Sequence, residues 1–276
     1  MQEVKCRIAP SLGGGFAGTP EEVWGTPPYN PETDIELPCV FFGLYGLPDF
    51  YALWKHKGKK YILWAGSDIT HFTNGYWLDE KGFMKLNPIS LAKWINKNCE
   101  SWVENQVEYE ALKKLGIWSQ VCPSFLGNVE DYEISFKQGN KVYCSVSGDD
   151  FDLYKWPEVL KLAKQNEDID FYLYGNTKQF KHNLPNVFVK GRVSQEQMNK
   201  EVKEMQGALR LLSFDGCSEL VVKGALWGQY PISLISYPHT LKPTQIRDIL
   251  DKKEPNHLGR LYFIDKLNKF PWNQKK

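Results

Sequence analysis

The chain has 276 residues and a mass of 31.9 kDa, and its 34 basic and 33 acidic residues give a formal net charge of +1. Its 42% of hydrophobic residues can build a sizeable core, which excludes the disordered and low-complexity classes. The balanced charge also argues against a polybasic protein that binds nucleic acid through many phosphates. Residues 1–122 carry 12 basic and 14 acidic side chains (net −2) and the remainder 22 and 19 (net +3), so a small anionic ligand is expected on the C-terminal side.

The cysteines and the apolar segments indicate the cellular compartment in which the protein is expected. Six cysteines are scattered without a closely spaced pair, which argues against zinc ribbons and redox motifs. A chain of this size with no apolar leader is expected to be a reduced cytosolic protein. The most apolar windows, 37–47 and 61–66, are too short to span a bilayer, so we expect a soluble, cytoplasmic protein.

Short apolar runs alternate with helical patterns in the first half of the chain. A strand is predicted at 4–9, followed by irregular backbone over 10–31. The remaining predicted elements, in chain order, are a strand at 38–44, a helix at 49–56, a strand at 61–65, helices at 90–98 and 105–115, and a strand at 117–121. This alternation predicts parallel strands joined by crossover helices.

A turn-rich stretch at 123–139 is the predicted boundary between two domains, 1–122 and 123–276. The alternation then restarts, with strands at 141–146, 171–174, 187–190, 208–214 and 231–236 and helices at 156–165, from 195, and at 218–226. Methionines at helical spacing after residue 195 are interpreted as core filling. The fold class is therefore α/β, with two halves in tandem.

In parallel α/β halves, ligands bind beyond the carboxyl ends of the strands. One such turn is Asp215-Gly216-Cys217-Ser218, which joins a predicted strand to a predicted helix. Glycine lets a ligand approach the backbone there, and the free N–H groups of the helix end favour a diphosphate. The alternative interpretation is that Asp215 and Ser218 only cap the helix.

Residues 142–237 resemble the donor-binding domain of GT-B glycosyltransferases, closest to the retaining, glycogen-synthase-like group called family 4. The matching segments are the strand and loop at 142–148, Lys155 before a helix, DFYLYGN, LPNVFVKGRVSQEQM and LRLLSFDGCSELVVKGALWGQYPIS. KKYILWAGSD and LKKLGIWSQVCPSFLG resemble the acceptor domain and linker more weakly. The resemblance implies two Rossmann-like domains facing across a cleft, with a reduced N-terminal domain, and a glycosyltransferase that uses a nucleotide-sugar donor such as a UDP-sugar.

The family's Glu-x₇-Glu motif can be carried over only in part. Its first acid falls on Asp215 and its second on Lys223, and Glu219, one helical turn earlier, is a possible substitute. Lys155 stands where the family has its diphosphate-binding lysine. No arginine stands near Ser147, so Arg192 is a candidate by proximity alone. The remaining predicted donor-binding residues are Gly148, Gly175, Asn176, Val193, Gly216, Cys217 and Ser218.

The implied chemistry is departure of a nucleoside diphosphate from an oxocarbenium-like centre, helped by helix N-termini and basic side chains. We therefore expect no metal and no cofactor besides the donor substrate. Asp68, a second candidate for catalysis, and His71 could face the acceptor, although a turn role for Asp68 and a surface role for His71 are the competing interpretations. Gly13, Gly14 and Gly15 could form a loop near the phosphates.

Three other functions stay open. Asp150 and Asp152 follow a predicted strand and could hold a divalent metal, as in GT-A glycosyltransferases. The chain could instead be a GT-B-derived binding module without activity, because of Lys223 and the missing arginine. A modified DNA base is a minor option for the acceptor: aromatic side chains could stack on bases, while the weak charge argues against a duplex footprint. The acceptor and the oligomeric state are not predicted.

Overall fold

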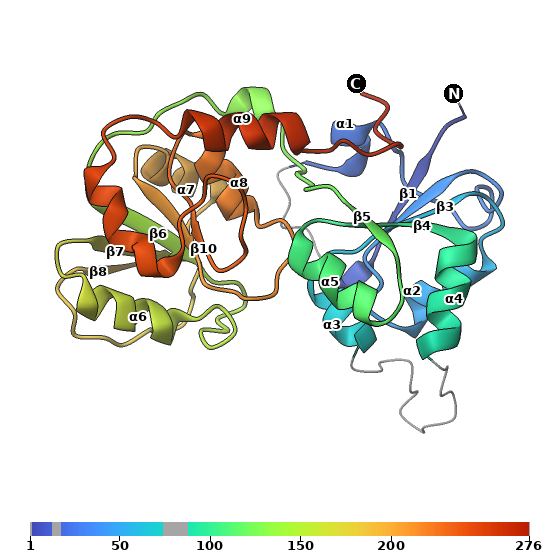
Figure 1. Cartoon of the computed structure of the whole chain (residues 1–276), viewed down its shortest axis with the longest axis horizontal. Helices are drawn as coiled ribbons and strands as arrows, with labels where there is room; N and C mark the ends of the chain where they lie inside the picture. The colour runs from blue at the N-terminus through green and yellow to red at the C-terminus, as the bar shows by residue number, and fades with distance from the viewer. Residues whose placement is uncertain (1, 13–17, 74–87, 276) are drawn as a thin grey trace. The chain divides into compact units, whose positions relative to one another are not determined.

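Two five-stranded parallel sheets, one in each of two units, make up the fold (Figure 1). The computed structural model describes residues 2–12, 18–73 and 88–275. The first unit comprises Met1–Asn128, Phe214–Cys217 and Lys266–Lys276, and the second comprises Val129–Ser213 and Ser218–Asp265. A single boundary along the chain therefore does not describe the units, because a tetrapeptide and the C-terminal tail belong to the first.

The first sheet runs in plain chain order. Its strands are β1 (Lys5–Ile8), β2 (Cys39–Phe42), β3 (Lys60–Leu63), β4 (Cys99–Val103) and β5 (Ser119–Val121), paired in the order β1-β2-β3-β4-β5. Each strand pairs in parallel with the next; for example, Cys39 lies opposite Lys60. Because right-handed crossovers that always step in one direction leave their helices on one face, this order predicts helices on a single side.

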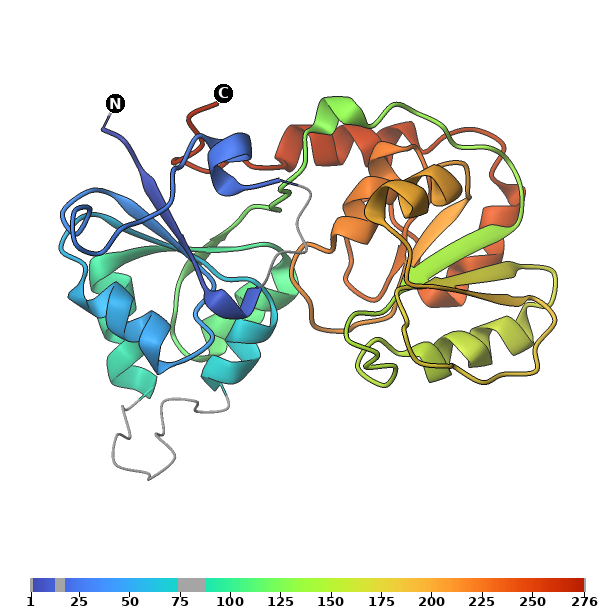
Figure 2. The same cartoon turned by 180° about the vertical axis from the view of Figure 1, so that it is seen from behind.

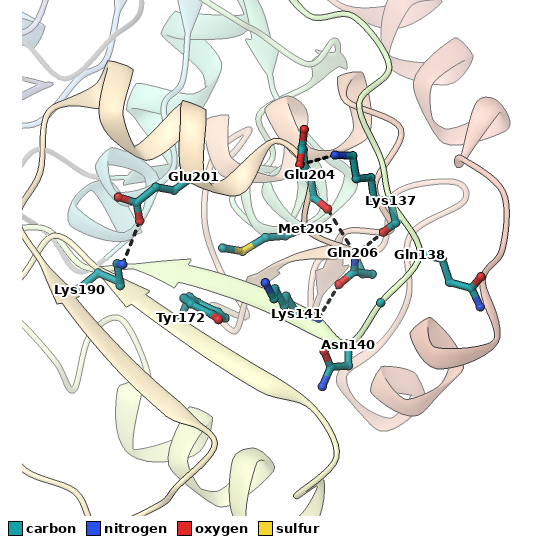
Figure 3. Close-up of a pocket in the computed structure, with 11 residues that line it drawn as sticks. Lys137, Gln138, Asn140, Lys141, Tyr172, Lys190, Glu201, Glu204, Met205 and Gln206 are labelled. Atoms are coloured by element: carbon teal, nitrogen blue, oxygen red, sulfur yellow. Dashed lines mark hydrogen bonds and ion pairs between the residues drawn. The ribbon is translucent and has the colours of Figure 1, made fainter.

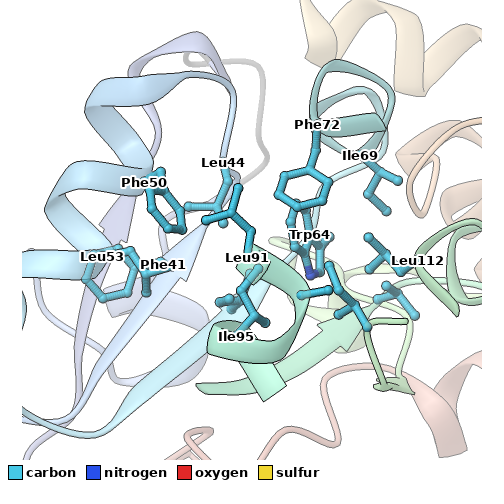
Figure 4. Packing of buried hydrophobic residues seen from close by; sticks show 14 of the residues in the cluster. Phe41, Leu44, Phe50, Leu53, Trp64, Ile69, Phe72, Leu91, Ile95 and Leu112 are labelled. Atoms are coloured by element: carbon cyan, nitrogen blue, oxygen red, sulfur yellow. The ribbon is translucent and has the colours of Figure 1, made fainter. Parts of the chain in front are cut away.

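The helices of the first unit follow that expectation. They are α1 (Pro20–Trp24), α2 (Leu47–Lys55), α3 (Ser67–Thr73), α4 (Pro88–Asn98) and α5 (Gln106–Lys114), with a 3₁₀ turn at Pro10–Leu12. Figures 1 and 2 show α2 to α5 on one side of the sheet and α1 on the other. Figure 4 shows the core under α2 to α5, where Trp64 packs edge-on against Phe72 at 5.3 Å between ring centroids and donates its indole N–H to Ser101 Oγ.

The opposite face of the first sheet is covered by α1 and the C-terminal tail. Trp24 of α1 packs against Phe42 of β2 and against the tail residues Phe270 and Trp272. The Phe270 and Trp272 rings stack at 4.4 Å with only 7° between their planes, and both side chains are fully buried. The tail therefore supplies the second apolar layer that this sheet requires.

The second sheet reverses its strand order. Its strands are β6 (Lys141–Ser145), β7 (Asp170–Tyr174), β8 (Val187–Gly191), β9 (Gly207–Arg210) and β10 (Ile232–Ser233), in the order β10-β9-β6-β7-β8. The chain steps outward from β6 to β8 and then returns to the other side of β6 for β9. This arrangement makes the junction of β6 and β9 a topological switch point, where α/β sheets bind ligands at the strands' carboxyl ends.

Helices cover both faces of the second sheet. They are α6 (Trp156–Gln165), α7 (Gln195–Val202), α8 (Glu219–Leu226) and α9 (His257–Lys266), with 3₁₀ segments at Val129–Asp131 and Pro243–Asp251. α6 packs Trp156, Val159 and Ala163 against β6 and β7. On the other face Gly224 of α8 approaches Ala208 of β9 so closely that an added Cβ would lie 2.9 Å from the alanine Cβ.

Most predicted elements are present, and the differences have identifiable causes. β4 was not predicted, because it follows α4 without a turn and contains Glu100 and Ser101. The strand predicted at 208–214 ends at Arg210. Helices form at α1, α3 and α9, where no helix was predicted. Met198 is only half-buried, so the core-filling interpretation holds for Met205 but not for Met198.

Candidate functional site

The loops after β6, β7 and β8 meet at the carboxyl edge of the second sheet. Gly175 N donates to Gly191 O at 2.9 Å. The Asp149 carboxylate accepts hydrogen bonds from Thr177 N at 2.6 Å and from Lys178 N at 3.2 Å. The structure therefore brings five predicted donor-binding residues to one edge: Gly148, Gly175, Asn176, Arg192 and Val193.

Gly175 is the position in this edge that only glycine fits. Its φ of +97° lies in a region that L side chains rarely adopt, and an added Cβ would lie 2.2 Å from Val146 O. The next residue, Asn176, is buried and donates from Nδ2 to Lys178 O at 2.9 Å, while its Oδ1 accepts no hydrogen bond within the described part of the chain. A buried acceptor without a donor is a position that a ligand hydroxyl or N–H could satisfy.

The loop between β6 and α6 carries unusual backbone strain. Asp149 and Lys155 have φ of 57° and 60°, and they are two of only four non-glycine residues with positive φ in the described ranges. Such conformations are sparsely populated and cluster at functional sites. Lys155 is the N-cap of α6, so the helix begins at the predicted diphosphate lysine.

Arg210 was not predicted, and it is the last residue of β9. β9 is the neighbour of β6 across the switch point, so Arg210 ends at the edge where the topology predicts a ligand. Its guanidinium lies 4.8 Å from the centre of the Tyr154 ring, in the loop that leads to Lys155. Arg210 was missed because a strand running to residue 214 would put it in mid-strand.

Arg192, the arginine that was predicted, is exposed and follows the edge strand β8. Two strand spacings separate β8 from β6, which is about 10 Å. The structure therefore puts Arg192 on the predicted edge, but farther from the switch point than Arg210 is.

Glu219 and Lys223 form an ion pair on the first two turns of α8. Lys223 Nζ lies 2.8 Å from Glu219 Oε2, and Lys223 is only 8% exposed. Lys223 therefore does not lie on a solvent-exposed face of α8. Ser218 is the N-cap of α8, but its side chain makes no capping hydrogen bond.

Asp215, Gly216 and Cys217 belong to the first unit. Cys217 N donates to Glu104 Oε2 at 2.7 Å, and Asn105 Nδ2 donates to Asp215 O at 2.8 Å. Glu104 and Asn105 follow β4, so this tetrapeptide is bound at the carboxyl end of the first sheet. Neither Glu104 nor Asn105 was predicted, because β4 itself was not predicted.

Glu104 and Glu108 form a buried acidic pair. Glu108, in the first turn of α5, is completely buried and accepts from Glu104 N at 2.7 Å. Burial raises the pKa of Glu104 to about 7, against the effect of the hydrogen bonds from Ser124 Oγ and Cys217 N. Burial, and then the charge of Glu104, also raises the pKa of Glu108 well above its usual value. The two carboxyl groups therefore resist double ionisation.

Asp68 is fully buried at the start of α3. Its carboxylate accepts hydrogen bonds from Leu44 N, Ala65 N and Ile69 N at 2.8 to 3.0 Å. Burial raises its pKa to about 6, although these bonds favour the ionised form. Its contacts are thus those of a residue that organises the turns after β2 and β3, which was the competing interpretation. His71 is exposed.

The metal-binding alternative finds no support at Asp150 and Asp152. Asp150 Oδ1 accepts from Leu153 N at 3.0 Å, a contact that stabilises a turn, and Asp152 is exposed. Among the described residues, no three His, Cys, Asp or Glu side chains are grouped to hold a metal ion. Gly13, Gly14 and Gly15 lie outside the described residues.

A cavity of about 420 Å³ in the second unit lies away from these loops (Figure 3). It is lined by residues that begin β6 or precede β9, by Tyr172 of β7 and Lys190 of β8, and by α7. Two of its lysines are paired with glutamates, Lys137 with Glu204 at 2.7 Å and Lys190 with Glu201 at 3.2 Å. With Lys141, the lining has three lysines against two glutamates, so the cavity carries little net positive charge for a diphosphate.

Comparison with known proteins identifies the fold. No family model and no curated protein matches the sequence. Solved structures do match, and 83% of the chain superposes on GT-B glycosyltransferases, so the chain has the GT-B fold. That fold, with its two sheets, also replaces the GT-A alternative. No helix in the described ranges has the length and apolar character needed to cross a membrane.

Three of these structures illustrate the likeness. A TarM variant from S. aureus, in complex with Fondaparinux, alpha-GlcNAc-glycerol and UDP, has a TM-score of 0.54 at 12% identity. The pneumococcal O-GlcNAc transferase GtfA, in complex with UDP and GlcNAc, gives 0.50 at 10%, and the sucrose-phosphate synthase from Thermosynechococcus elongatus gives 0.57 at 10%. In each case 83% of this chain is covered; it spans 52%, 54% and 69% of those chains, so about half the length of the first two.

Proposed function

We propose that the chain is a glycosyltransferase that takes a sugar from a nucleoside-diphosphate donor. The observation that carries this proposal is the position of two cations at the switch point of the second sheet, within a GT-B fold: Lys155 ends the loop after β6, and Arg210 ends β9 and lies 4.8 Å from the ring of Tyr154, the residue before Lys155. Two cations at one edge suit a diphosphate, whose charge grows as it leaves the sugar. UDP is the first nucleotide to test, because TarM and GtfA were crystallised with it.

The donor is held at the carboxyl edge of the second sheet. Lys155 and Arg210 bind the phosphates, and Gly175 lets the ligand approach the backbone without a side chain in the way. Asn176 Oδ1 accepts a hydrogen bond from a ribose hydroxyl or base N–H. Arg192 takes a secondary role at the outer end of this edge.

Asp215 is the proposed carboxylate beside the donor sugar. In the reaction, the bond from the sugar C1 to the diphosphate oxygen breaks and a bond from C1 to an acceptor oxygen forms. The proton of the acceptor hydroxyl passes to the departing diphosphate. Asp215 stabilises the positive charge that develops at C1. Asp68 contributes indirectly, because its hydrogen bonds fix the turns after β2 and β3.

A ligand screen tests the donor site. UDP-, GDP-, ADP- and TDP-sugars are added in a thermal-shift assay, where a ligand at 100 times its Kd stabilises the folded state by about 2.7 kcal/mol. Lys155→Met should lower the shift, while Lys164→Met, at an exposed lysine of the same helix, should leave it unchanged. If no sugar nucleotide shifts the wild-type protein, the proposed donor site is wrong.

Turnover tests the reaction itself. Release of nucleoside diphosphate should be abolished by Asp215→Ala in a protein that stays folded. We propose a metal-independent, retaining reaction, so chelator should leave the rate unchanged and the anomeric configuration of the product should match that of the donor. Inhibition by chelator or an inverted product would contradict these two points separately.

A second candidate is a sugar-nucleotide-binding module without transferase activity. The ion pair between Lys223 and Glu219 favours it, because the acid proposed for the ribose contact is already neutralised by a buried lysine. Saturable binding of a sugar nucleotide with no turnover in the presence of varied acceptors would favour this candidate over the enzyme.

A further inference from the structure

The tetrapeptide Phe214–Cys217 contacts the loops after β3 and β4 through backbone atoms. An added Cβ on Gly66 would lie 2.6 Å from Gly216 N, and one on Gly216 would lie 2.1 Å from Glu104 Oε2. The side chain of Phe214 packs against the core under α2 to α5. Gly66 therefore allows an approach in which backbone meets backbone, and Gly216 leaves room for the Glu104 carboxylate.

Two side chains bind this tetrapeptide on either side of Gly216. Glu104 Oε2 accepts from Cys217 N at 2.7 Å, and Asn105 Nδ2 donates to Asp215 O at 2.8 Å. These bonds fix the peptide groups on both sides of Gly216. The backbone that carries Asp215 is thus set by the two residues that follow β4.

Glu104 and Asn105 are themselves fixed. Glu104 is 5% exposed, its Oε1 accepts from Ser124 Oγ, and its backbone N–H is bound by Glu108. Asn105 Oδ1 caps α5 by accepting from Val107 N at 3.0 Å and from Glu108 N at 3.1 Å. A group that positions another must have little freedom of its own, and both residues meet that condition.

We propose that Glu104 and Asn105 are positioning residues, which hold the Asp215 backbone in the conformation needed for sugar transfer without touching the substrate. The role in transfer rests on the proposed function. The clamp, by which we mean the hydrogen bonds that Glu104 and Asn105 make with the tetrapeptide, does not depend on the proposed function and can be measured in the absence of any ligand.

The clamp requires hydrogen-bond acceptance at Glu104 rather than its charge. In Glu104→Gln, the amide oxygen can accept from Cys217 N while the amide nitrogen donates to Ser124 Oγ. In Glu104→Ala both bonds are lost. The two variants remove the same charge, so a difference between them does not arise from charge; Cys39 and Cys144 show whether the smaller alanine side chain loosens the fold as a whole.

The thiol of Cys217 provides the readout, because it is on the clamped segment. The full chain is treated with iodoacetamide, and alkylation of each cysteine is followed by mass spectrometry. Cys39 and Cys144 are buried and serve as internal references for global unfolding. Glu100→Ala, at a more exposed acid on β4, is the matched control.

Glu104→Ala should raise the alkylation rate of Cys217 about tenfold, as expected for the loss of one hydrogen bond to the Cys217 backbone. In Glu104→Gln, the alkylation rate of Cys217 should stay within about twofold of the rate in the control Glu100→Ala. The alkylation rates of Cys39 and Cys144 should be unchanged in all variants. If Glu104→Ala leaves Cys217 as slow as in Glu100→Ala, or if the glutamine variant is as fast as the alanine variant, the clamp is wrong.

Kinetics then test the positioning role. With the donor that the screen identifies, Glu104→Ala should lower kcat at least about tenfold with the donor KM within about twofold, and Glu104→Gln should restore kcat. A clamp seen by alkylation with no change in kcat would overturn the positioning role while leaving the proposed function intact. An inactive wild-type protein would overturn the proposed function while leaving the clamp measurable.

Discussion

The ionisation of Glu104 should make the first unit less stable as the pH rises. Glu104 lies in a dry environment with three other acids facing it: Glu108 on α5, Asp68 on α3 and Asp215 on the tetrapeptide. Its pKa is raised from 4.5 to about 7, mainly by burial. The folded state therefore holds a proton that the unfolded state has already released.

The magnitude follows from this difference. At 1.36 kcal/mol for each pH unit, a rise from 4.5 to about 7 corresponds to about 3 kcal/mol. The stabilisation is fully present below pH 4.5 and is lost as the pH rises through about 7. Between pH 5 and pH 8 this one group should lower the free energy of unfolding by about 2 to 3 kcal/mol.

Glu104→Gln tests this reasoning because it keeps the hydrogen bonds and removes the titration. The free energy of unfolding in urea is measured at pH 5 and pH 8 for the wild type, Glu104→Gln and the control Glu100→Gln. Reaction of the buried Cys39 thiol with 4,4′-dithiodipyridine reports on the first unit alone. The glutamine variant should gain about 2 to 3 kcal/mol of unfolding free energy on the wild type between the two pH values. Parallel pH profiles for the two proteins would refute the proposed titration of Glu104.

Three further predictions concern the second sheet and the tail. Arg210→Met should raise the donor Kd, measured by calorimetry, by about tenfold or more, and by more than Arg192→Met does, because only Arg210 ends at the switch point. Gly175→Ala should destabilise the second unit by about 1 to 3 kcal/mol in denaturant and weaken donor binding, since φ of +97° and a Cβ 2.2 Å from Val146 O both oppose it. Trp272→Ala should lower the free energy of unfolding by about 3 to 5 kcal/mol, because its side chain is fully buried against the first sheet, whereas alanine at the exposed Trp118 should change it little.

Sequence reasoning predicted the elements whose apolar pattern and end signals agree. The helix at Trp156–Gln165 has the predicted bounds, because Pro157 marks its first turn and its apolar residues recur on one face. The strands at 141–146 and 187–190 were predicted from apolar runs next to polar turns, and they differ from the observed strands by one residue.

The parts that were missed depend on contacts far apart in the sequence. The tail segment around Phe270 and Trp272 has no periodicity, and it folds because the second face of the first sheet needs a cover. Glu104 resembles any surface acid until β4 is recognised, since only the end of that strand brings it against Cys217. Arg210 becomes a candidate only when β9 ends at residue 210 and lies beside β6.

The topologies of the two sheets explain why their edges carry opposite charge. In the second sheet the strand order reverses at β6 and β9, which is the kind of position where α/β sheets bind ligands, and Lys155 and Arg210 lie at the ends of the segments that meet there. In the first sheet the order never reverses, and the edge is filled by the protein's own tetrapeptide, held by Glu104 and Asn105. A diphosphate would meet buried carboxyl groups at the first edge and cations at the second. The proposed phosphate site is therefore assigned to the second sheet, and the proposed role of the first sheet is to fix the backbone of Asp215.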